Sequence, residues 1–117
     1  MNKILFLSFL AIGILTSASL KTNSNSGKSI FLDNKCSKCH SIESQGIKHT
    51  SEPPEGAKYP PPDLSDVGNR HDAEWMQKWL HKEVEQHGKK HMKKFTGSDD
   101  ELKTLTTWLA TLKNKGS

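Results

Sequence analysis

The segment Cys36-Ser37-Lys38-Cys39-His40 constrains this chain more than any other. Two cysteines separated by two residues and followed at once by histidine form the C-x-x-C-H signature of covalent haem attachment. The two thiols can lie one turn apart and form thioethers with the two vinyl groups on one edge of a porphyrin. His40 then lies beneath the iron, where a neutral imidazole nitrogen binds axially. Cys36 and Cys39 are the only cysteines, so no disulfide framework competes with this interpretation.

Two other kinds of site also use a C-x-x-C pair: a redox-active dithiol and one half of a zinc site. A dithiol of the thioredoxin type accompanies a βαβ pattern, which this sequence does not show. A zinc site needs a second pair of ligands, and His87 and His91, four residues apart, can supply one. Haem attachment is therefore favoured, and zinc stays the alternative.

The chain has 117 residues, enough for one small domain, and only 32% of them are hydrophobic. Much of this apolar content lies in the first twenty residues. The remainder has few side chains for a hydrophobic core, a deficit that a large apolar cofactor would fill. We therefore expect the apoprotein to be largely unfolded.

Residues 1–19 have the pattern of a secretory signal peptide, with Lys3 as the positive charge, Ile4–Leu15 as a short apolar stretch and small residues after it. The apolar stretch is shorter than the roughly 20 residues of a membrane span, although an uncleaved membrane anchor stays an alternative. Residues 20–26 are polar and are predicted to be a flexible N-terminal segment, so the domain proper is residues 27–117. Export to the periplasm fits the cofactor, because haem is attached covalently outside the bacterial cytoplasm.

Three stretches have the periodicity of helices. Residues 27–35 form a short helix that leads into the cysteine motif, and residues 72–86 form an amphipathic one with acidic residues at its start. A third helix starts at Ser98, which forms a capping box with Glu101, and its apolar stripe runs to the C-terminus. Residues 41–71 contain five prolines and three glycines, so we expect a long loop of the kind that wraps a cofactor edge.

The sequence resembles class I cytochromes c, a family of small monohaem electron carriers, over residues 27–113. The resemblance is strongest in three segments: Gly27–Phe31 followed by the C-x-x-C-H motif, Pro62–Leu64 running on to Val67–Arg70, and His91–Phe95 followed by the capped helix. It implies an all-α fold, the cytochrome c fold, in which a few helices surround one covalently attached haem c and long loops close its faces. Lys93 stands where many members of the family have a proline.

The resemblance also implies particular contacts. Gly27 and Phe31 are expected to cross the C-terminal helix at Trp108. The carbonyl of Pro62 is expected to accept a hydrogen bond from Nδ1–H of His40, which would fix the tautomer and orientation of the ring and raise its basicity as a ligand.

The sixth ligand of the iron comes from elsewhere in the chain, and methionine and histidine are the candidates. Met76 lies within an apolar stripe, where a core role is the better interpretation. Met92 lies in a polar, lysine-rich loop, where an apolar side chain otherwise has little reason to be. His91 and His87 are its rivals, and bis-histidine ligation would lower the reduction potential. We predict cofactor contacts through Cys36, Cys39, His40 and Met92, with His40 and Met92 as the metal ligands.

These features predict a one-electron carrier that shuttles electrons between exported or membrane-bound redox enzymes. It is not expected to be an enzyme, because two filled axial positions leave none for a substrate. The alternatives are a haem subunit of a larger oxidoreductase, and a protein with a labile sixth ligand that reacts with peroxide or a diatomic gas.

The formal net charge is +4, and five lysines lie around Met92 in the sequence: Lys82, Lys89, Lys90, Lys93 and Lys94. They form either an ordinary solvated surface or a positive rim that attracts acidic redox partners. No basic run is interleaved with stacking aromatic residues, so nucleic acid is not an expected partner. The predicted carrier is a monomer and contacts a membrane only if its N-terminal segment is uncleaved.

Overall fold

The computed structural model describes residues 26–114, so the predicted signal peptide and most of the predicted flexible segment lie outside the described part of the chain. The elements follow in the order α1 (Gly27–Asp33), η1 (Cys36–Lys38), η2 (Glu43–Gln45), η3 (Val67–Asn69), α2 (Ala73–Leu80) and α3 (Asp99–Ala110), where η marks a short 3₁₀ turn. Residues 26–114 contain no β-strand, only isolated bridges. The predicted all-α fold is confirmed.

Helix α1 begins at Gly27 because Ser26 caps it. The Ser26 hydroxyl accepts a hydrogen bond from the amide of Ser29 at 3.1 Å, which satisfies one of the free amides of the first turn. Ser26 is thus part of the folded domain, although it is the last residue of the segment predicted to be flexible.

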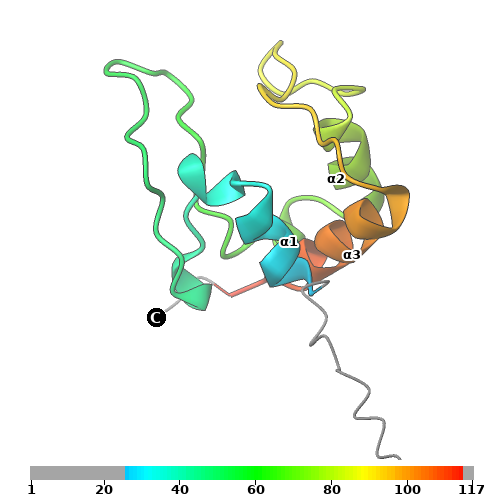
Figure 1. The fold of residues 1–117 in the computed structure, drawn as a ribbon. Helices are drawn as coiled ribbons and strands as arrows, with labels where there is room; N and C mark the ends of the chain where they lie inside the picture. Colours follow the sequence, from blue (N-terminus) through cyan, green and yellow to red (C-terminus); the bar gives the residue numbers. More distant parts are fainter. Residues whose placement is uncertain (1–25, 115–117) are drawn as a thin grey trace, which may run out of the picture.

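Helices α1 and α3 cross each other (Figure 1). Gly27 lies so close to Trp108 that a Cβ at position 27 would overlap the Cβ and Cγ of the tryptophan. Phe31, which is 1% exposed, meets the same tryptophan edge to face, with ring centroids 6.1 Å apart. The predicted crossing is confirmed, and it requires a residue without a side chain at position 27.

Helix α2 is shorter than its predicted range of residues 72–86. It begins after Asp72, whose carboxylate accepts an amide hydrogen bond of 2.8 Å from the first turn. It ends at Leu80 because Lys82 has a left-handed backbone (φ 60°) and the amide of Glu83 donates to a carbonyl of the last turn at 2.8 Å, as in a Schellman motif. The longer prediction was wrong because a lysine, and not a glycine, takes the left-handed position that ends the helix.

Helix α3 begins at the predicted capping box. The amide of Glu101 donates to the Ser98 hydroxyl at 3.2 Å, and the amide of Ser98 donates to the Glu101 carboxylate at 3.5 Å. The helix ends at Ala110 and does not continue to the C-terminus as predicted. Leu112 still lies in the core beyond it, because its carbonyl accepts a hydrogen bond from the amide of Gly68 at 2.8 Å.

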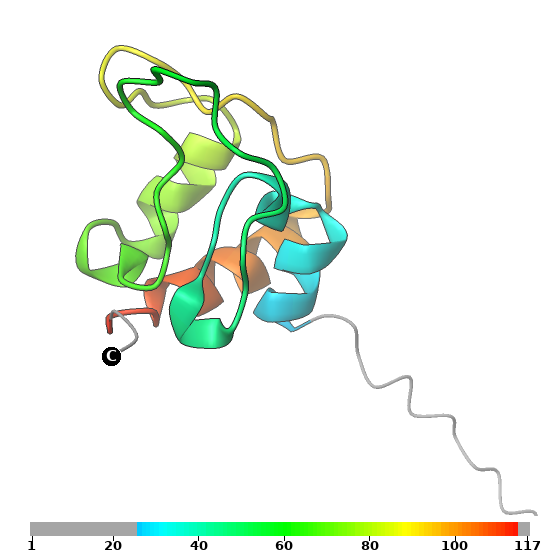
Figure 2. The ribbon, with the colours of Figure 1, turned by 90° about the vertical axis from the view of Figure 1, so that its left-hand side faces the viewer.

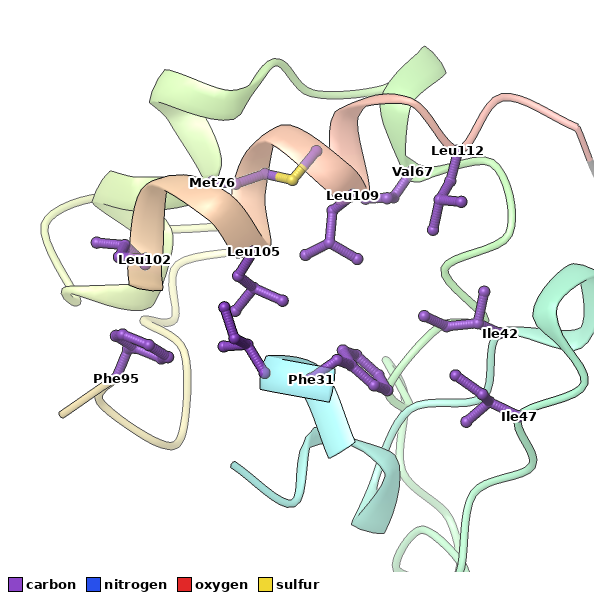
Figure 3. Close-up of a cluster of buried hydrophobic side chains, with 11 residues drawn as sticks. Phe31, Ile42, Ile47, Val67, Met76, Phe95, Leu102, Leu105, Leu109 and Leu112 are labelled. Atoms are coloured by element: carbon purple, nitrogen blue, oxygen red, sulfur yellow. The ribbon is translucent and has the colours of Figure 1, made fainter. Parts of the chain in front are cut away.

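Buried apolar side chains from all three α-helices and from the loops form one core (Figure 3). Its members are Ile30, Phe31, Ile42, Ile47, Val67, Met76, Phe95, Leu102, Leu105, Leu109 and Leu112. The core therefore lies where the helices meet, and side chains from the loops complete it.

Two long segments extend from this helical part in the same general direction: the chain after η2, drawn in green, and the loop between α2 and α3, drawn in yellow (Figures 1 and 2). They are bridged by the parallel rings of Tyr59 and His87, whose centroids lie 3.8 Å apart. The predicted loop of residues 41–71 is irregular over most of its length, with brief 3₁₀ turns towards its two ends. Among residues 26–114, no helix is long and apolar enough to cross a membrane.

Candidate cofactor site

The cysteine motif forms a single tight turn after α1. Lys35 has a left-handed backbone (φ 58°), which redirects the chain out of the helix. The amides of Cys39 and His40 both donate to the carbonyl of Cys36, at 3.2 and 3.0 Å. Cys36 is half-buried, Cys39 is exposed, and neither is in a disulfide. Burial raises the pKa of the Cys36 thiol, and the nearby charge of Lys93 opposes this rise.

His40 leaves this turn with its ring held by a residue outside the motif. Its Nδ1 lies 2.9 Å from the carbonyl oxygen of Pro62, as predicted. A carbonyl can only accept, so Nδ1 carries the proton and Nε2 is the nitrogen available to a metal. Burial lowers the pKa of His40, and the hydrogen bond to Pro62 opposes this in part, so the ring is held in its neutral, metal-binding form.

Asp63 fixes the loop that carries the Pro62 carbonyl. Its carboxylate accepts hydrogen bonds from the hydroxyl of Ser41 (2.7 Å) and from the amides of Glu43 (3.0 Å) and Ser65 (2.8 Å). Partial burial disfavours ionisation, but these hydrogen bonds outweigh it and lower the pKa of Asp63 to about 2. Asp63 lies in the Pro62–Leu64 segment, but its role is not predicted from the sequence, where its one local signal is its position directly after a run of prolines, at which Asp favours turns.

A second imidazole lies across from His40. The rings of His40 and His91 have centroids 6.3 Å apart and planes only 9° from parallel. Nδ1 of His91 donates to the carbonyl of Lys93, so Nε2 is again the nitrogen without a proton. Burial lowers the pKa of His91, and the charge of Lys82 lowers it further, while the hydrogen bond to Lys93 opposes the shift.

The predicted sixth ligand and its rivals lie in different places. Met76 is 3% exposed and belongs to the core, as predicted. Met92 is 91% exposed, and His87 stacks on a tyrosine of the facing loop. Of these candidates, the structure places His91 beside His40, and ligation by Met92 stays a prediction.

His91 ends a row of aromatic rings along α2. His71 stacks on Trp75 with centroids 3.6 Å apart, Trp75 stacks on Trp79 at 5.5 Å, and Trp79 meets His91 edge to face at 5.3 Å. The helical periodicity of the sequence predicts only an apolar stripe for the tryptophans. The spacing of four between residues 71, 75 and 79 is the signal that predicts stacking along one helix face.

Comparison with known protein families identifies the family to which the chain belongs. The sequence model of the family described as Cytochrome c matches residues 24–113, which is most of the chain. The protein belongs to the cytochrome c family. No curated protein and no solved structure gave a significant match.

Cytochromes c carry haem c, with its iron, attached covalently through a C-x-x-C-H motif, and Cys36 and Cys39 fit that motif. The local structure around the cysteine motif of this cytochrome fits a covalently attached haem. Both thiols are unpaired on one tight turn, and the hydrogen bond to Pro62 leaves Nε2 of His40 available as a ligand. The alternative of a zinc site gains no support, because residues 26–114 contain no group of three or more His, Cys, Asp or Glu side chains placed to hold a metal ion.

Lysines surround the loop of this cytochrome that carries His91. Lys82 is half-buried, and the other members of the cluster, Lys89, Lys90, Lys93 and Lys94, are exposed. Nζ of Lys93 donates to the carbonyl of Asn34 at 3.3 Å, which ties the loop to the end of α1. Four exposed amines therefore lie on this one loop.

Proposed function

We propose that this cytochrome is a one-electron carrier that shuttles electrons between exported or membrane-bound redox enzymes. The observation that carries the proposal is the single tight turn that presents both thiols and His40, with Nδ1 of that histidine held by Pro62. When bound, the haem supplies an iron that changes between the ferric and ferrous states.

The residues of this chain bind and orient the group. Cys36 and Cys39 would hold it by two thioethers, and the carbonyl of Pro62 keeps the ring of His40 in the tautomer whose Nε2 carries the free lone pair. The loop after α2 would supply a second side chain to its iron, either Met92, as predicted from the sequence, or its neighbour His91. With two side chains bound to it, the iron would have no position left for a substrate, so we expect the protein to transfer electrons and not to act as an enzyme.

The proposed place of action is the periplasm, because the family is typically exported and residues 1–19 have the pattern of a signal peptide. The partners we propose are redox proteins with acidic docking surfaces. The exposed lysines around His91 support this, since complementary charge raises the rate of encounter more than the final affinity.

The test is to express the chain with an export signal and haem maturation enzymes, and to measure the mass and the optical redox titration of the product. We expect the added mass of one haem and a reversible titration of one electron. The reduced protein is expected to resist carbon monoxide, because a filled sixth position excludes it. A product of bare polypeptide mass would contradict the proposal, and rapid carbon monoxide binding would favour the gas-reactive alternative.

A further inference from the structure

The rings of His40 and His91 are parallel without touching. Two other near-parallel ring pairs, Tyr59 with His87 and His71 with Trp75, have centroids 3.8 and 3.6 Å apart, which is contact distance. The His40–His91 pair has the same parallel arrangement at 6.3 Å, with a plane angle of 9°. The centroids of this pair are thus at least 2.5 Å further apart than those of the other two pairs.

This separation matches two imidazoles on one metal ion. A histidine nitrogen binds a first-row metal at about 2 Å. A five-membered ring with bonds of about 1.33 Å has its atoms roughly 1.1 Å from its centre. Two such rings on opposite sides of one ion have centres about 6 Å apart, and the observed distance is 6.3 Å.

The hydrogen bonds prepare both rings in the same way. Each Nδ1 donates to a backbone carbonyl, of Pro62 for His40 and of Lys93 for His91. Neither Nε2 has a hydrogen-bond partner. Among residues 26–114, the one side-chain polar atom that is both buried and without a partner is Oγ of Ser44, so neither Nε2 is buried. Both Nε2 atoms are therefore accessible as well as unprotonated, as a metal ligand must be.

The loop holds His91 inward and Met92 outward. The amide of Phe95 donates to the carbonyl of Leu80 at 2.9 Å, and the Phe95 side chain is buried. In addition, the rings of Trp79 and His91 meet edge to face. Turning Met92, now 91% exposed, into the site would rotate a segment that these contacts fix.

From these observations we infer that His91, and not Met92, is the sixth ligand, so that the iron is held by two histidines. This inference rests on the proposed haem attachment and specifies its second axial ligand. It predicts a lower reduction potential than methionine ligation gives, because a thioether ligand raises the potential.

The decisive experiment compares the matured wild-type holoprotein with Met92→Ala. We expect the ferric wild-type protein to lack the weak near-infrared charge-transfer band of a sulfur ligand. Met92→Ala should leave its low-spin spectrum and midpoint potential unchanged. A sulfur band in the wild type that disappears in Met92→Ala would overturn the inference.

A second variant tests the assignment of His91 by removing its imidazole. Reduced His91→Ala should bind carbon monoxide at least tenfold faster than the wild type, or its ferric form should acquire a sulfur band because Met92 takes the place of His91. Added imidazole should restore the wild-type spectrum. His87→Ala, which removes a histidine from the same loop, should leave the spectrum unchanged. An unaltered low-spin spectrum in His91→Ala would overturn the inference, and if that variant does not mature, the wild type and Met92→Ala still decide.

The haem mass is measured on every sample, so the two proposals fail in different ways. Absence of covalent haem would contradict the proposed function, whereas covalent haem with a sulfur ligand would contradict only the assignment of His91.

Discussion

His40 and His91 approach the same space from two parts of the chain that are built differently. His40 directly follows the cysteine turn, and the carbonyl that orients it belongs to a loop tied down by the carboxylate of Asp63. His91 lies in a loop between two helices, and its ring is oriented by a carbonyl two residues away and by the edge of Trp79. The His40 side thus depends on hydrogen bonds between two loop segments, and the His91 side on contacts within its own loop and with the neighbouring helices.

The two sides of the site are therefore expected to have different roles. The His40 side keeps the cofactor attached and is supported by several hydrogen bonds, so damage there should reduce stability or cofactor content. The His91 side holds a residue outside the attachment motif, so damage there should change ligand exchange and leave attachment intact. Four predictions test this division, from the largest expected effect to the smallest.

The double variant Cys36→Ala with Cys39→Ala should have the largest effect. It removes both thioethers, and we expect no covalent haem and a chain without a cooperative thermal transition, because the cofactor supplies much of the apolar interior. Mass spectrometry and circular dichroism check this. Ser37→Ala, between the two cysteines, is the control and should mature normally; a double variant that melts cooperatively would show that the helical core folds alone.

Gly27→Ala should be the next most damaging change, because both sides of the site rest on the crossing of α1 and α3. The added Cβ would overlap Trp108, and overpacking of this kind costs about 2–3 kcal/mol. Denaturant unfolding of the holoprotein measures it. Gly56→Ala is the matched control: its φ of 78° costs about 1 kcal/mol, but no atom lies within 4 Å of the new Cβ. Equal losses in the two variants would show that close packing at Gly27 is unimportant.

These two predictions involve features that the sequence shows well. The cysteine turn is encoded by adjacent residues, and the approach of Gly27 to Trp108 and of His40 to Pro62 followed from the resemblance to class I cytochromes c. The sequence did not predict the end of α2 or which of residues 91 and 92 points inward. The end of α2 depends on the left-handed backbone of Lys82, at a position where glycine is usual. Which of residues 91 and 92 points inward depends on where Phe95 meets Leu80, a contact across the loop that no helix or turn pattern specifies.

Asp63→Asn tests the His40 side through pH. The folded pKa of Asp63 is about 2, below the ordinary value of 3.8, so its ionised form stabilises the folded state above about pH 4. That contribution is lost as the pH falls from about 4 towards 2. We expect Asp63→Asn to lose about 1–2 kcal/mol at pH 7 and to approach the wild type at acidic pH. The exposed Glu55→Gln is the control, and a loss in Asp63→Asn that is independent of pH would contradict the role of the charge.

Trp79→Leu tests the His91 side and should have the smallest effect on the holoprotein. Covalent haem should be retained, because nothing on the His40 side changes. Loss of the edge contact at 5.3 Å lets the ring of His91 move, so we expect the reduced protein to bind carbon monoxide several-fold faster, with the low-spin ferric spectrum kept. Trp75→Leu removes the neighbouring tryptophan, which stacks on Trp79 and His71, and should change this rate less. Equal rates in the two variants would mean that general packing of the row, and not the contact with His91, holds the ligand.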